Sequence, residues 1–137
     1  MSFEPTKKHY KLFDYINKSD SNEFKKWTEG LQKKQIAKLN QKLDKLEISG
    51  DELMPQLLTD SNVPGVKKLR ITVQNVQLRP LLCNGPVNND KEYTLLMGAK
   101  EIGDKWHPKK APETALKKLK EITRDPENRR RKHERVN

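Results

Sequence analysis

The side chains of this chain that could take part in chemistry are mostly cationic, and other reactive types are few and scattered. The only cysteine is Cys83, and the three histidines, His9, His107 and His133, lie far apart in the sequence. The chain has no Walker-type glycine-rich loop, no Cys/His spacing for zinc, no HExxH and no cluster of carboxylates such as a Mg²⁺-dependent nuclease needs. We therefore expect no metal and no other cofactor, and any catalysis is expected to use basic side chains.

Positive charge is the strongest compositional signal. The 137 residues include 29 Lys and Arg against 19 Asp and Glu, a formal net charge of +10 at pH 7. Such an excess favours a polyanionic partner, because each phosphate that is neutralised releases condensed counterions. We expect this partner to be RNA, with an acidic protein as the open alternative. An anionic membrane is disfavoured, because no segment pairs a basic face with a strong Trp/Phe/Leu face.

Length and hydrophobic content predict one small cytoplasmic domain. Hydrophobic residues make up 32% of the chain and aromatic residues 6%, enough for one modest core. No stretch approaches ~18 consecutive apolar residues, so no membrane span is expected. The first eight residues lack the apolar run of a secretory signal, and a single cysteine fits a reducing compartment. We expect a structured domain over residues 1–125 and a basic, flexible tail over residues 126–137.

Hydrophobic periodicity predicts an α+β fold. The predicted elements are a strand within residues 9–16, a helical hairpin on either side of Gly30, a three-stranded antiparallel meander over residues 66–73, 76–83 and 92–97, and a helix from about Pro112 to Asp125. Apolar strand residues are expected to be buried beneath the hairpin residues Phe24, Trp27, Ile36, Leu39 and Leu43; these strand residues are Leu69, Ile71, Val73, Leu78, Leu82 and Leu95. Pro80 cannot donate to a sheet ladder, so it predicts a bulge or an open edge.

This layout resembles the RelE/ParE superfamily of toxins from toxin–antitoxin pairs, particularly its HigB-like, phage-associated branch. That family has a Leu-Arg pair on its second strand, an aromatic-Arg pair on its third, and a basic segment with proline before its last helix. The corresponding residues are Leu69-Arg70, Leu78-Arg79-Pro80 and Lys109-Lys110-Ala111-Pro112, and the resemblance extends from Tyr10 to Ile122. Leu78 stands where the family usually has Tyr, and Pro80 where it has a branched residue.

The resemblance implies a metal-free endoribonuclease that cleaves mRNA on the ribosome and is silenced by a cognate antitoxin. In that reaction the RNA 2′-hydroxyl attacks the adjacent phosphate and a cyclic phosphate is left, which requires a base, an acid and cations around the developing charge. By this resemblance the catalytic residues are Arg79, His107, Arg70 and Lys100, with both arginines on the phosphate and His107 as proton carrier. The RNA-binding residues are Lys68, Lys105, Trp106, Lys109 and Lys110.

Other functions stay open. A non-catalytic member of the same fold, such as a ParE-like inhibitor of DNA gyrase, is favoured by the missing Tyr before Arg79. A basic phage or mobile-element protein that only binds nucleic acid is a further alternative. The candidate residues also have simpler interpretations: Arg70 and Arg79 as solvated residues on an open sheet face, His107 as an ordinary loop residue, and Trp106 as an anchor of its loop to the core.

Overall fold

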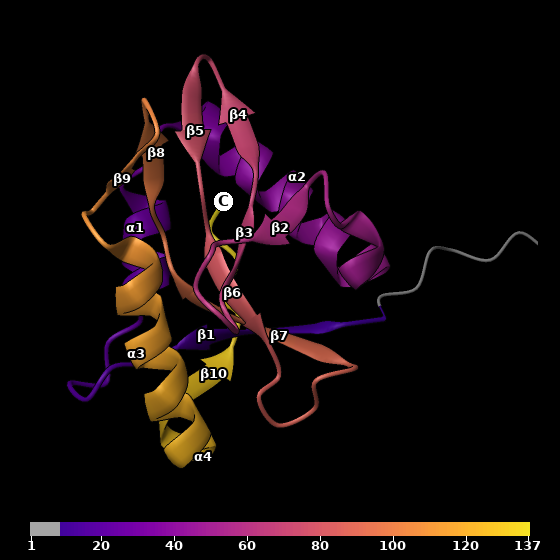
Figure 1. Ribbon diagram of the computed structural model, residues 1–137, viewed down its shortest axis with the longest axis vertical. Helices are drawn as coiled ribbons and strands as arrows, with labels where there is room; N and C mark the ends of the chain where they lie inside the picture. Colours follow the sequence, from indigo (N-terminus) through magenta and orange to yellow (C-terminus); the bar gives the residue numbers. More distant parts are fainter. Residues whose placement is uncertain (1–8) are drawn as a thin grey trace, which may run out of the picture.

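The computed structural model describes residues 9–137 and has helices on both faces of a bent sheet (Figure 1). The α-helices are α1 (Glu23–Glu29), α2 (Lys33–Ser49), α3 (Ala111–Arg124) and α4 (Pro126–Arg129), with a 3₁₀-helix, η1, at Gly50–Leu53. The strands are β1 (Lys11–Tyr15), β2 (Leu58–Asp60), β3 (Lys67–Leu69), β4 (Ile71–Val73), β5 (Val76–Leu78), β6 (Leu81–Asn84), β7 (Glu92–Met97), β8 (Lys100–Ile102), β9 (Lys105–His107) and β10 (Arg130–Lys132). The α+β class predicted from the sequence is confirmed. The first eight residues, for which no secretory signal is expected, lie outside the described residues.

The strands form two sheets, and the meander contributes strands to both of them. One sheet has the order β10-β1-β7-β6-β3-β2, and the other has the order β4-β5-β8-β9. β1 runs parallel to β7, whereas β6 pairs antiparallel with both β3 and β7. The first strand therefore lies beside the last strand of the meander, because the helical hairpin carries the chain back across the sheet before the meander begins.

A bend crosses the meander and divides each of its strands in two. The breaks fall at Arg70, at Arg79-Pro80 and at Gly98-Ala99. They are neighbours in space, since Arg79 N donates to Ala99 O at 2.8 Å and Leu69 N to Pro80 O at 3.0 Å. A register shift follows Pro80, between Leu81 and Leu82, which confirms the predicted irregularity. β8, which continues β7 beyond the bend, was not predicted.

Two cores lie on opposite faces of the sheet, and alternation along the strands separates them. Leu82 packs with α1 and α2, whereas its neighbours Leu81 and Cys83 pack with α3. The core predicted beneath the hairpin is present, with Val73 and Trp27 only partly buried at its margin. At Gly98 the ring of Trp27 packs directly against the backbone, because a Cβ there would lie 1.9 Å from that ring.

The segment expected to be a flexible tail instead forms α4 and β10. β10 pairs antiparallel with β1, so it occupies an edge of the sheet that would otherwise be open. Arg130 lies 4.0 Å from the ring centroid of Phe13 and 2.9 Å from the Glu92 carboxylate. His133 reaches the buried carboxylate of Asp14 at 2.7 Å. Composition predicted disorder because the segment has little to bury; the structure places it through backbone pairing and ion pairs instead.

Candidate functional site

At the bend, a carboxylate links two of the basic residues singled out in the sequence. Lys68 Nζ on β3 and Arg79 Nε, just after β5, both donate to Glu101 Oε1 on β8, each at 2.8 Å. The three side chains keep only 15%, 11% and 20% of their surface exposed, in that order. Glu101 is not among the residues that the sequence singles out, because no strand is predicted between residues 97 and 112, and only strand β8 brings its carboxylate across to Arg79. We call Lys68, Arg79 and Glu101 the bend cluster.

The Arg79 guanidinium is held on every nitrogen. Besides the bond from Nε to Glu101, Nη1 donates to Leu78 O and Nη2 to Gln77 Oε1, both at 2.9 Å. A longer bond of 3.5 Å joins Nη1 to Ile71 O. Arg79 is therefore not a solvated residue on an open face. Its side chain ties β4, β5 and β8 together, and a phosphate would have to compete with Glu101 for its N–H groups.

Trp106 forms one side of the bend cluster. It is the register partner of Glu101 across β8 and β9, and Lys68 Nζ lies 5.2 Å from the centroid of its ring. The indole is partly buried against the core beneath α3. The ring therefore anchors the β8–β9 hairpin to the core, and a cation–π contact holds Lys68 close to it.

The structure does not bring the other predicted catalytic residues into the bend cluster. Lys100 and His107 are register partners, and each neighbours a residue of the Glu101–Trp106 pair in its strand. Because successive side chains in a strand point to opposite faces, Lys100 and His107 face away from Arg79. Arg70 is exposed at the bend, and its side chain forms no hydrogen bond or ion pair within residues 9–137.

The remaining predicted RNA-binding residues lie on the surface. Lys105 on β9 and Lys109 and Lys110 in the segment before α3 are exposed. Lys110 adopts a left-handed backbone conformation with φ of 57°, at the N-cap of α3. These three lysines follow one another along the chain on either side of His107. They follow Glu101 shortly in the sequence, and their exposed side chains are accessible to a polyanion.

The ionisation of Glu101 depends on its two cationic neighbours. Burial alone would raise the pKa of this carboxyl group. Hydrogen bonds from Lys68 and Arg79, together with their charges, outweigh the burial and lower the pKa below its ordinary value of 4.5. Glu101 is therefore a carboxylate at neutral pH.

This pKa shift predicts acid sensitivity. The unfolded chain binds the Glu101 proton at a higher pH than the folded chain, so the stabilisation is complete above pH 4.5 and is lost as the pH falls through the lower folded pKa. We expect urea midpoints to fall across this range, and Glu101→Gln to flatten the decline. Glu113→Gln, at an exposed position of α3, is the matched control. Equal pH slopes for the parent and Glu101→Gln would contradict the prediction.

Other chemistries receive little support from the described residues. Burial raises the pKa of the Cys83 thiol to about 12, so this side chain is a protonated core residue rather than a nucleophile. Among residues 9–137, no group of three or more His, Cys, Asp or Glu side chains is placed to hold a metal ion. Within the same range, no helix is both long and apolar enough to cross a membrane.

Comparison with protein-family models, with curated proteins and with solved structures finds no match for this chain.

Proposed function

We propose that the protein is a RelE-like toxin of a type II toxin–antitoxin pair, an endoribonuclease that cleaves mRNA on the ribosome without a metal. The observation that carries the proposal is the bend cluster, in which a carboxylate lies between an arginine and a lysine at 2.8 Å from each. The order of elements supports it, since a strand, a helical hairpin, an antiparallel meander and a helix follow one another as in that family. The net charge of +10 supports an RNA substrate.

In the proposed reaction, the phosphate of the scissile bond displaces Glu101 from Arg79 and Lys68. The guanidinium and the ammonium then neutralise the charge that develops on the phosphate oxygens. Glu101, released next to the substrate, accepts the proton of the 2′-hydroxyl as that oxygen attacks phosphorus. The bond from phosphorus to the 5′-oxygen breaks, and the products are a 2′,3′-cyclic phosphate and a 5′-hydroxyl end. The leaving oxygen takes its proton from Lys68 or from water.

His107 and Lys100 take a different role in this proposal from the one that the resemblance implies. Because they face away from Arg79, they do not reach the same phosphate. Together with Lys105, Lys109 and Lys110 they would contact the RNA backbone on either side of the cleaved bond, without reading the base sequence. An antitoxin would then silence the protein by laying an acidic segment over the exposed Arg70 and the neighbouring lysines.

Brief induced expression followed by primer extension on total RNA tests the proposal. We expect new 5′ ends inside the coding regions of translated messages, and fewer of them when translation is blocked before induction. End-group analysis should find cyclic phosphates upstream of the cuts. Arg124→Ala is the matched control for substitutions in the bend cluster, because Arg124 is an exposed arginine at the end of α3, remote in sequence from the bend. Intact RNA during growth arrest by the parent protein would contradict the proposal.

A non-catalytic nucleic-acid-binding or gyrase-inhibiting protein is the second candidate, and one observation favours it. All three guanidinium nitrogens of Arg79 already have partners within the protein, and in this second function the arginine serves only to brace the bend. In that case growth inhibition, if present, would come with uncut RNA, and the exposed lysines would account for binding. The same primer-extension experiment separates the two functions.

A further inference from the structure

Lysines follow one another along the outward side of α2. They are Lys34, Lys38, Lys42 and Lys45, and we call them the α2 lysine stripe. Because an α-helix has about 3.6 residues per turn, these side chains fall within an arc of about 80° and extend over about 17 Å of the helix axis. Lys34 and Lys45 are exposed, and Lys38 and Lys42 are half-buried. The stripe therefore presents a straight row of positive charge to its surroundings.

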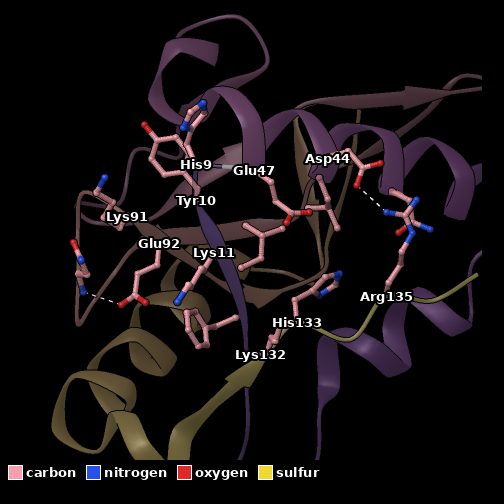
Figure 2. Close-up of a pocket in the computed structure, with 15 residues that line it drawn as sticks. His9, Tyr10, Lys11, Asp44, Glu47, Lys91, Glu92, Lys132, His133 and Arg135 are labelled. Carbon is pink, nitrogen blue, oxygen red and sulfur yellow. Dashed lines mark hydrogen bonds and ion pairs between the residues drawn. The ribbon is translucent and has the colours of Figure 1, made fainter. Parts of the chain in front are cut away.

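The α2 lysine stripe has no negative charge to balance it. The acidic residues of α2 are Asp44 and Glu47, and both line a cavity of about 840 Å³ between α2, the start of β1 and the segment that follows β10 (Figure 2). There Asp44 Oδ1 accepts from Arg135 Nη1 at 2.7 Å. No lysine of the stripe forms an ion pair with a carboxylate of residues 9–137. The acidic side chains of α2 thus lie on a different side of the helix from its lysines.

The lysines of the stripe repel one another. Burial lowers the pKa of the Lys42 ammonium group, and the nearby charges of Lys45 and Lys38 lower it further. Like charges three or four positions apart in a helix destabilise it, and this spacing joins Lys42 to both of those neighbours. A bound anion would relieve the repulsion, so the stripe gains more from phosphate groups than isolated surface lysines do.

The stripe lies apart from the bend cluster. α2 packs on the face of the sheet that carries Leu69 and Ile71. Lys68 of the bend cluster precedes Leu69 on β3, so its side chain points to the opposite face of the sheet. A ligand of the stripe is therefore not the phosphate of the proposed cleavage reaction.

The surroundings of the stripe favour a double-stranded nucleic acid. An open groove of about 400 Å³ lies beside it, lined by Lys34, Ala37, Lys38, Gln41 and Val73. Neither the stripe nor this lining includes an aromatic side chain, on which the bases of a single strand would stack. Ala37 is small enough for a backbone to approach closely, and the exposed amide of Gln41 can bond to a 2′-hydroxyl. Double-stranded RNA displays its 2′-hydroxyls and phosphates across a wide, shallow minor groove.

We propose that the α2 lysine stripe binds the sugar–phosphate backbone of double-stranded RNA without reading its sequence. The lysines would contact phosphates along the minor groove, and Gln41 would contact a 2′-hydroxyl. An anionic membrane fits less well, because the apolar residues of α2 are buried in the core and are not available for insertion. The proposal does not depend on the ribonuclease function, since it uses no residue of the bend cluster.

Two variants of equal net charge test the proposal. The first combines Lys38→Gln, Lys42→Gln and Lys45→Gln. The control combines Lys117→Gln, Lys120→Gln and Arg124→Gln, at exposed positions of α3. Each variant loses three positive charges, so the formal net charge falls from +10 to +7 in both. The full chain is titrated into a short fluorescein-labelled RNA duplex over a series of salt concentrations, and fluorescence anisotropy gives the dissociation constant.

The α2 variant should bind the duplex about 10²-fold more weakly at physiological salt, and its salt dependence should be flatter by about 2–3 in the log–log slope, because each lost phosphate contact removes about 0.9. The α3 control should keep the slope of the parent. Equal losses in both variants would mean that only net charge matters, and would overturn the proposal. Equal or tighter binding of a DNA duplex or a single RNA strand of the same sequence would also overturn it, as would binding to phosphatidylserine vesicles that the α2 variant loses.

The fold of the α2 variant is checked by its urea midpoint. We expect an unchanged or higher midpoint, because glutamine has about the helix propensity of lysine and the substitutions remove repulsion. If this variant does not fold, Lys34→Gln combined with Lys45→Gln takes its place, because both side chains are exposed. That pair should flatten the slope by about 2, and a parental slope would contradict the proposal.

Discussion

Arg79→Ala should lower the rate of RNA cleavage by about 10²–10³-fold, the usual effect of removing one group that stabilises charge in a transition state. Growth inhibition should be lost with it. The expectation follows from the proposed function, in which the guanidinium leaves Glu101 for the phosphate. Arg79→Lys keeps one charge but loses the planar fork, so it should recover only part of the activity. The measurement is primer extension with purified ribosomes and a defined message.

The same substitution also affects the fold, and the experiment has to separate the two effects. Arg79 makes hydrogen bonds to two side chains and to the carbonyl of Leu78, so Arg79→Ala should lower the free energy of unfolding by about 1–3 kcal/mol. Glu101→Ala removes the same ion pair from its other side and serves as the comparison. If the pair were only structural, both variants would lose activity in proportion to their unfolded fraction. Full cleavage by folded Arg79→Ala would contradict the assignment.

Removal of residues 130–137 should lower the free energy of unfolding by about 3–5 kcal/mol, as expected when a buried charge loses its partner. The truncation uncovers the edge of β1 and takes His133 away from Asp14, which is fully buried. It also takes Arg130 away from Glu92, whose side chain is 8% exposed. Urea unfolding followed by tryptophan fluorescence measures the change.

Single substitutions within the segment keep this prediction testable if the truncated chain fails to fold. Arg130→Ala and His133→Ala should each reproduce a large part of the loss. Arg131→Ala should change stability by less than about 1 kcal/mol, because Arg131 pairs with Asp20 at the exposed surface. An unchanged urea midpoint for the truncated chain would contradict the structural role of β10. The basic composition of residues 127–137 also predicts that their deletion weakens RNA binding and flattens its salt dependence, and this stays a prediction.

Local patterns in the sequence were sufficient for most of the elements. Alternation over residues 66–73 and 76–83 predicted strands whose residues Leu69, Ile71, Leu78 and Leu82 are buried, with Val73 only partly so, because a strand with one face in a core must repeat every second residue. The spacing of Leu39, Leu43 and Leu46 likewise placed α2 against the sheet. Pro80 predicted an irregularity in the sheet, because a residue without an N–H group cannot continue the hydrogen-bond ladder between strands. The strands, the helix and the irregularity follow from backbone geometry over a few residues, so they can be predicted from the sequence without knowledge of the fold.

The functional arrangement depends on contacts between distant parts of the chain, and only the tertiary structure decided it. Glu101 meets Lys68 across 33 positions, and this happens because β8 continues the meander past the bend. The same strand register turns His107 away from Arg79, although both were natural candidates for one site. His133 reaches Asp14 across 119 positions, in a segment whose composition predicted a flexible tail. The sequence determined which side chains are charged and which are apolar; strand pairing decided which of those charges neutralise one another, because an ion pair depends on distance in space and not on separation along the chain.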